Sequence, residues 1–231
     1  MKIKMTLSAI SAICGILAAP VAIATPNEEL GWYGSIKAAQ TSQRVSDMED
    51  SLRPAGAVLP QETRQEFVNG SLGMGYQFGA GWRAEVEYTL PQKQEYTSDV
   101  AGRFRGSLNH HEVDAERMMA NAYYDLPVKE DIAVFASAGL GWAKVKSSGW
   151  QGNVARQFES KTVNNLAYSV GAGVTYSPVK KISLDVGYRY VDMGRIESGL
   201  NNFANARGLR DEKMKAKLVS HEIYIGGRYR F

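Results

Sequence analysis

The feature that most constrains the fold is an alternation of apolar and polar side chains with a period of two residues. From Trp82 to Leu90 the sequence is WRAEVEYTL, so apolar residues take every second position and charged or polar residues take the positions between. On a helix the two sets would be mixed around the circumference, whereas on a strand they point to opposite faces. This segment is therefore predicted to be a β-strand with one apolar face and one charged face.

The same alternation recurs along the chain and predicts eight strands in all. Besides 82–90, four clear repeats and three weaker candidates lie at 69–78, 165–176, 182–190, 222–231, about 31–40, about 113–126 and about 132–146. The connections between them alternate in length. Short turns rich in Gly and Pro are expected at 79–81, 126–131 and 177–180, and long polar loops at roughly 41–64, 91–112, 147–163 and 194–217. Short turns at one rim and long loops at the other are typical of outer-membrane barrels, in which the long loops are extracellular.

A membrane-spanning barrel is favoured over a soluble β-sandwich, which would also show alternation. No apolar run approaches the length of a membrane-spanning helix, and the mean hydropathy is −0.29, so a spanning chain must use strands diluted by polar residues. Aromatic residues gather near both ends of the strands, with Tyr76 and Trp82 beside the turns and Trp142 and Tyr190 beside the loops. Two aromatic belts match the two interfaces of a bilayer. The sequence thus predicts an all-β, eight-stranded antiparallel up-and-down transmembrane barrel.

The N-terminal residues predict export from a Gram-negative cell. Lys2 and Lys4 precede an apolar stretch, and Ala22-Ile23-Ala24 is a small-x-small cleavage site, so residues 1–24 are expected to be a signal peptide. Residues 25–231 would then form one outer-membrane barrel, and Cys14, the only cysteine, would be removed. That barrel would carry 25 basic and 24 acidic residues, a balance that indicates no nucleic-acid partner.

The most specific motifs lie toward the C-terminal end of the chain. They are ISLDVGYRY at 182–190, GRIE at 194–197 and HEIYIGGRYRF at 221–231, with GYQF at 75–78, GWR at 81–83 and YYDL at 123–126. This set resembles the opacity-protein (Opa) family of Gram-negative surface proteins, also called opacity family porins. The resemblance implies an eight-stranded barrel in the cell outer membrane and binding of host-cell receptors or glycosaminoglycans through variable loops. The terminal Phe231 is similar to the C-terminal signal that the outer-membrane assembly machinery reads, so contact with that machinery is expected.

The inward face of the predicted barrel carries charges that must pair, because an unpaired buried charge is costly. An eight-stranded barrel is only wide enough for its own side chains to fill the interior. We therefore predict a salt-bridged lumen and keep a narrow, porin-like pore as the alternative. The residues of this ion-pair network are Arg83, Glu85, Glu87, Asp185, Arg189, Glu222, Arg228 and Arg230.

No catalytic, cofactor-binding or metal-binding residues are assigned. Ser220-His221-Glu222 places three suggestive residues in a row, but neighbours on a strand point to opposite faces and cannot form a triad among themselves. His110 and His111 are expected in a long loop, solvated and without a metal. A barrel enzyme that acts on lipid A, or an outer-membrane protease, is kept as a further alternative.

The loops are then expected to form the binding surface, since binding residues concentrate on the loops of a rigid scaffold. The last loop, 194–217, has six basic and three acidic residues, with the basic ones toward its end. Such a cluster would attract lipopolysaccharide phosphates or sulfated glycans. The prediction is a monomeric, non-enzymatic surface barrel for adhesion, in contact with outer-membrane lipid and lipopolysaccharide and able to meet a host-cell receptor. Its predicted binding residues are Arg207, Arg210, Lys213, Lys215 and Lys217.

Overall fold

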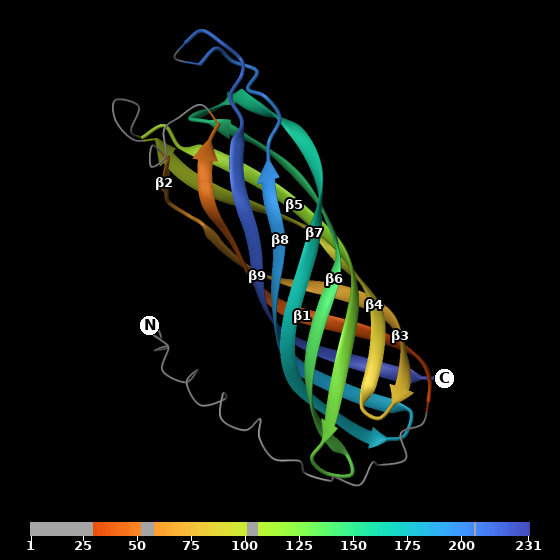
Figure 1. Cartoon of the computed structure of the whole chain (residues 1–231). Coiled ribbons are helices and arrows are strands. Elements are labelled where there is room, and N and C mark those ends of the chain that lie inside the picture. The colour runs from red at the N-terminus through yellow and green to blue at the C-terminus, as the bar shows by residue number, and fades with distance from the viewer. Residues whose placement is uncertain (1–29, 52–57, 101–105, 206) are drawn as a thin grey trace, which may run out of the picture.

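The computed structural model describes residues 30–51, 58–100, 106–205 and 207–231, which form an all-β barrel (Figure 1). Within these ranges there is no helix long and apolar enough to cross a membrane. The predicted signal peptide at 1–24, with Cys14, lies outside the described residues. The strands are β1 (Gly31–Asp50), β2 (Val58–Pro60), β3 (Arg64–Gly79), β4 (Trp82–Val100), β5 (Asn109–Pro127), β6 (Ile132–Gln151), β7 (Asn153–Val179), β8 (Ile182–Glu197) and β9 (Met214–Arg230).

Eight of these strands close into a barrel. Each long strand pairs antiparallel with the next long strand along the chain, and β1 pairs with β9 to complete the ring, with Tyr33 opposite Arg230 at the periplasmic end. The short β2 pairs only with the upper end of β4. The predicted eight-stranded antiparallel barrel is therefore confirmed, and β2 is an addition inside the first predicted loop.

The outer face of the barrel is apolar over its lower part, as the alternation predicts. On β4, Trp82 and Val86 are 53% and 48% exposed, whereas Glu85 and Glu87 are buried at 2% and 0%. An apolar band that surrounds the whole molecule would aggregate in water, so it marks the surface that meets lipid. Large side chains in this band include Ile36, Leu72, Val86, Leu140, Val170, Val186 and Ile225.

Aromatic side chains frame this band at two levels. Near the short turns, Trp32 packs on Tyr76 at 5.2 Å between ring centroids, and Trp82 packs on Tyr124 at 4.9 Å. At the other end, an upper belt of outward-facing rings is formed by Tyr88, Trp142, Tyr168 and Tyr190. Rings at both interfaces are the expected anchors of a transmembrane barrel.

The strands continue well above the upper belt, and here the predicted loop limits are wrong. β1 continues to Asp50 and β4 to Val100, and a single residue, Gly152, separates β6 from β7. The predicted third loop at 147–163 is therefore the tip of a β-hairpin. Gly152 has a φ of 67°, the left-handed conformation that a tight connection requires. The loop that rises furthest in Figure 1 connects β8 to β9.

The extension was missed because the polarity of the two faces is reversed above the belt. There, apolar residues such as Val113 and Leu218 point inward, and charged residues such as Asp114 and Lys217 point outward. On β4 a β-bulge between Thr89 and Gln92 also shifts the alternation by one residue. When the alternation of apolar and polar residues reverses and shifts within one strand, the sequence wrongly indicates that the strand ends there.

Candidate functional site: the lumen and the extracellular end

The middle of the lumen holds a continuous network of ion pairs. Lys37 on β1 bonds to Glu85 and lies 2.5 Å from Glu87, both on β4. Arg189 on β8 lies 2.9 Å from Glu87 and 2.7 Å from Glu222, so it links the two carboxylates. Arg117 on β5 lies 2.5 Å from the same Glu222. All five strands that contribute are tied together by buried, oppositely charged groups.

A second group of ion pairs lies nearer the periplasmic end. Arg83 Nε donates to Asp125 at 2.8 Å, and Arg228 lies 2.9 Å from Asp185. Thr175 donates a further hydrogen bond to Asp185 at 2.7 Å. Each buried charge therefore faces an opposite charge, which is what makes its burial tolerable.

The structure brings seven of the eight predicted lumen residues into these pairs and places the eighth elsewhere. Arg230 lies at the periplasmic rim, where its Nη2 donates to the carbonyl of Lys180. Sequence reasoning missed the partners Lys37, Arg117 and Asp125. All three face inward by strand parity, so the same alternation would have found them had their weaker strands been followed.

Glycine on the inner face has a structural cause. A Cβ added to Gly75 would lie 2.3 Å from Cζ of Tyr33, and one added to Gly187 would lie 2.7 Å from Cζ of Tyr224. The two tyrosine rings thus lie directly over bare backbone. A narrow lumen gains room for its rings and charges in this way.

Above the ion pairs the lumen is filled by an apolar plug. We use this name for the buried cluster around Val45, Val113, Val145 and Leu218, each at most 1% exposed. The remaining members of the cluster are Tyr96, Ala115, Met119, Ala143, Ala167, Val191, Met193, Ile196 and Ala216. These side chains pack against one another inside the barrel, and one of them, Tyr96, donates a hydrogen bond to the buried Gln43 at 2.6 Å.

The histidines occupy three separate environments. His110 and His111 lie on β5, so the expectation that they belong to a loop is wrong. His111 is fully buried opposite Tyr96 of the plug and lies 2.5 Å from Oγ of Ser147, and burial lowers its pKa to about 4. His110 faces outward, stacked on Trp150 at 4.6 Å and 2.6 Å from Glu95. His221 faces outward on β9, 2.6 Å from the hydroxyl of Tyr188.

The strand alternation separates the three residues of the Ser220-His221-Glu222 run. Ser220 and Glu222 are buried inside the barrel, whereas His221 between them is exposed outside it. Within the described ranges, no group of three His, Cys, Asp or Glu side chains is placed to hold a metal ion.

The fourth loop, residues 198–213, is attached to the upper end of β7. Backbone of Asn202 donates to the carbonyl of Gln157 at 2.8 Å, and Gln157 donates back to the Asn202 side chain at 2.9 Å. The ring of Phe203 packs edge-on against Phe158 at 5.5 Å, and Arg156 lies 4.0 Å from the centre of the Phe203 ring. The loop is therefore held in one position beside the hairpin tip.

Asn201 holds the base of this loop together. Its side-chain nitrogen donates to the carbonyl of Phe203 at 2.7 Å, and its side-chain oxygen accepts from the backbone of Glu212 at 2.7 Å. Because one buried amide joins the two ends of the loop, the loop cannot open without losing both bonds.

The predicted cationic cluster is divided between two places. Arg207, paired with Asp211 at 2.8 Å, and Arg210, which is exposed, belong to the fourth loop. Lys215 and Lys217 instead lie on the outer wall of β9, so their assignment to a loop is wrong. Lys213 lies at the junction, 3.8 Å from Glu197.

Acidic neighbours largely neutralise the two wall lysines. Lys217 lies 2.8 Å from Asp192, and Lys215 is directly opposite Glu49 on β1 and Glu197 on β8. Opposite charges at facing positions stabilise a sheet. In the fourth loop Arg207 has an aspartate partner at the same distance as Lys217, and Arg210 is an exposed cation.

The family follows from a match over nearly the whole chain. The model of the outer membrane protein beta-barrel domain matches residues 9–231. The chain belongs to this family. It is a protein of the outer membrane, and its aligned relatives confirm the resemblance to opacity proteins.

Three relatives illustrate what the chain is similar to. Outer membrane protein PagN of Salmonella typhimurium is 26% identical over 79% of this chain and 80% of its own length. A protein of Rickettsia bellii named as an adhesin is 26% identical over 69% of this chain and 73% of its own. Opacity protein opA65 of Neisseria gonorrhoeae is 21% identical over 87% of this chain and 97% of its own.

Solved structures share the fold at low sequence identity. OprG of Pseudomonas aeruginosa gives a TM-score of 0.56 at 11% identity, covering 87% of this chain and 97% of OprG. The outer membrane protease OmpT of Escherichia coli gives 0.52 at 7% identity, covering 91% and 99%. A likeness this distant concerns the barrel alone, because one fold hosts many functions.

Proposed function

We propose that this barrel is a non-enzymatic adhesin-type surface protein that binds its partner with its extracellular end. The observation that supports this most is the ordered surface formed by the fourth loop and the hairpin tip, where Arg156, Phe203 and Arg207 are held by specific contacts. A binding surface that is already ordered loses little conformational entropy when a partner binds. The adhesin and opacity-protein names of the relatives support the same class of function.

The composition of this surface suits a partner that is anionic and partly apolar. Leu200, Leu209 and Val154 are 42%, 49% and 64% exposed, and Arg156 and Arg210 lie in the same two segments of the chain. Exposed apolar side chains next to arginines are common in protein interaction sites. Sulfated glycans, lipopolysaccharide phosphates and an acidic receptor surface all offer the complementary charge.

The test compares the two groups of cations. Bacteria that express the wild-type barrel, an Arg207→Gln/Arg210→Gln variant or a Lys215→Gln/Lys217→Gln variant are measured for binding to immobilised heparin and to cultured host cells. We expect the arginine variant to lose at least about tenfold in binding, because it removes both arginines of the fourth loop, and the lysine variant, which changes only the outer wall of β9, to bind nearly as the wild type. Equal binding by all three strains at low salt would contradict the assignment, because low salt strengthens exposed charge interactions.

A narrow pore is opposed by the apolar plug. Ions that enter the lumen would have to displace close-packed side chains such as Val113 and Leu218, which are fully buried. The purified barrel should therefore show no reproducible conductance steps in planar lipid bilayers. Regular steps of one size would restore the pore as the working function.

An enzyme is opposed by the separation of the titratable residues described above. Expression of the barrel should leave the mass of lipid A unchanged in a mutant that lacks other lipid A-modifying enzymes. A reproducible mass loss of one acyl chain would contradict the proposal.

A further inference from the structure

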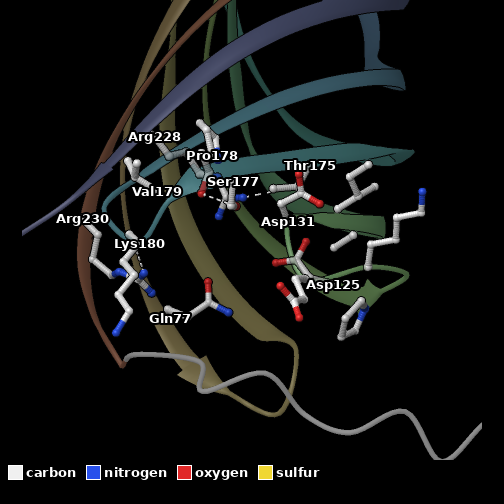
Figure 2. A pocket seen from close by; sticks show the side chains of 16 residues that line it. Gln77, Asp125, Asp131, Thr175, Ser177, Pro178, Val179, Lys180, Arg228 and Arg230 are labelled. Atoms are coloured by element: carbon white, nitrogen blue, oxygen red, sulfur yellow. Dashed lines mark hydrogen bonds between the residues drawn. The ribbon is translucent and has the colours of Figure 1, made fainter.

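The periplasmic end of the lumen opens into a polar cavity that neither the adhesion surface nor the plug explains. Its volume is about 350 Å³, within the range of small-molecule and peptide sites. Figure 2 shows side chains converging on it from the ends of several strands and from two turns. We call this space the periplasmic mouth.

Opposite charges line opposite sides of the periplasmic mouth. Arg228 and Arg230 come from β9 and Lys180 from the turn after β7 (Figure 2). Across the space, Asp125 on β5 and Glu130 and Asp131 in the turn after it outnumber Lys129 of the same turn. Three strands separate β5 from β9 around the barrel, so the closed sheet holds the two charged walls apart. Between the two walls lie uncharged polar groups, among them Gln77, Thr175 and Ser177.

Pairs deeper in the lumen fix the inner charges of both walls. Arg228 is held by Asp185 at 2.9 Å, and Asp125 is held by Arg83 at 2.8 Å. At the rim, Asp131 is partly exposed and Lys180 is exposed. The periplasmic mouth therefore has buried, paired charges on its inner side and solvent-accessible charges at its edge.

We propose that the periplasmic mouth binds a peptide end that carries both a carboxylate and an ammonium group. Arginine binds carboxylates in a bidentate geometry, and aspartate accepts hydrogen bonds from an ammonium group. A ligand of one sign would meet repulsion at one wall, whereas a dipolar ligand matches both. Hydroxyl and amide groups between the walls suit peptide N–H and C=O groups.

The location selects the class of peptide. The short turns of an outer-membrane barrel face the periplasm, where the cell wall offers short peptide stems with free amino and carboxylate groups. The occupant we infer is such a cell-wall stem peptide. Binding there would tether the barrel to the wall at the end opposite the adhesion surface.

The test uses the full barrel refolded in detergent micelles, labelled with ¹⁵N, and the tripeptide L-Lys-D-Ala-D-Ala as the probe. We expect saturable shifts of the backbone amides of Asp131, Ser177 and Arg230. A probe with both amines acetylated, or with its carboxylate amidated, should bind at least about tenfold more weakly. Unchanged affinity for both capped probes would overturn the dipolar assignment, and so would the absence of any saturable shift.

Two variants and a matched control locate the site. Arg230→Gln and Asp131→Asn should each weaken binding at least about tenfold. Lys181→Gln, an exposed change in the adjacent turn outside the cavity lining, should leave binding unchanged. Gel migration without boiling verifies that each variant is folded. Equal affinity for all folded variants would overturn the proposal, and the adhesion assay remains an independent measurement.

Discussion

Strong strand alternation predicts which charged side chains point into the lumen. It does not predict which partner each of them contacts. The pattern from Trp82 to Leu90 correctly turned Arg83, Glu85 and Glu87 into the lumen. Lys37 lies directly opposite Ser71 and Gly226, yet its ammonium reaches Glu87 on β4, two strands away. Such a contact depends on the curvature of the closed barrel and on side-chain length, which no local sequence pattern contains.

Glu222 should be the most sensitive of the lumen charges, because it faces both Arg117 and Arg189. Glu222→Gln leaves two buried guanidinium groups without their shared carboxylate, and we expect a loss of about 3–5 kcal/mol in unfolding free energy. Urea titration of the barrel in lipid vesicles measures this. Glu66→Gln, at an exposed pair with Arg64, should cause no measurable change. Equal stability of the two variants would contradict the paired-lumen description.

His111 should make the extracellular part of the barrel less stable in acid. Its folded pKa is about 4 and its ordinary value is 6.5. Between these values the opened form binds a proton that the folded form does not, so stability falls as the pH falls from 6.5 to 4. The full difference is on the order of 3 kcal/mol. Tyr96, the residue opposite His111 on β4, is bonded to Gln43 and provides no charge to compensate.

Hydrogen exchange of the upper strands at pH 7 and pH 5 measures this effect. His111→Leu should abolish most of the acid sensitivity, whereas His110→Gln, a change in the neighbouring outward-facing histidine, should leave it intact. Acid sensitivity that persists in His111→Leu would show that another group is responsible.

Secondary-structure elements were predicted well inside the bilayer and poorly above it. The sequence places turns at 79–81 and 177–180, where Gly and Pro occur, and the structure turns at 80–81 and, slightly later than predicted, at 180–181. The predicted loop limits are wrong because the outer face of the strands does not contact lipid above the upper belt, so its residues need not be apolar. Lys144 and Lys146 therefore face outward, and Val145 faces inward. The division of the predicted cationic cluster has the same cause, since Lys215 and Lys217 belong to this reversed part of β9.

The fourth loop should depend on one side chain for its order. Asn201→Ala removes the side-chain hydrogen bonds to Phe203, Leu209 and Glu212, and we expect tryptic cleavage at Arg207 or Arg210 to become several-fold faster. The barrel itself should keep its unboiled gel migration. Leu200→Ala, a change at an exposed neighbour, is the control and should be cut at the wild-type rate. Identical cleavage of both variants would mean that the contacts of Asn202 and Phe203 with β7 hold the loop without Asn201.

At the scale of the whole molecule, the closed barrel, its two aromatic belts and its residence in the outer membrane all follow from alternation and turn chemistry. The apolar plug does not, because it is assembled from single residues of several strands, such as Val45, Tyr96 and Met193. The plug can be recognised only once the register of the strands is known. The periplasmic mouth cannot be predicted from the sequence for the same reason.

Phe231 should matter for assembly more than for stability. It is 69% exposed beside the seam between β1 and β9, so it packs little against the rest of the protein. Phe231→Ser should shift the urea midpoint of the refolded barrel no more than Leu30→Ser does, but it should lower the amount of folded protein in outer membranes. Leu30→Ser, at a similarly exposed residue of the same rim, should assemble normally. Normal assembly of Phe231→Ser would remove the predicted role of this residue as an assembly signal.

The pairing of β1 with β9 governs the order in which this molecule can form. Neighbouring strands can meet as local hairpins, but the last row of hydrogen bonds joins residues nearly 200 positions apart, such as Tyr33 and Arg230. Contacts of such long sequence separation form slowly, and none of them can form before the final strand has been synthesised. Until then the sheet has two unpaired edge strands and an apolar outer face, both of which favour aggregation. The nascent chain must therefore cross the aqueous compartment unfolded and protected, and acquire its final shape only on reaching lipid.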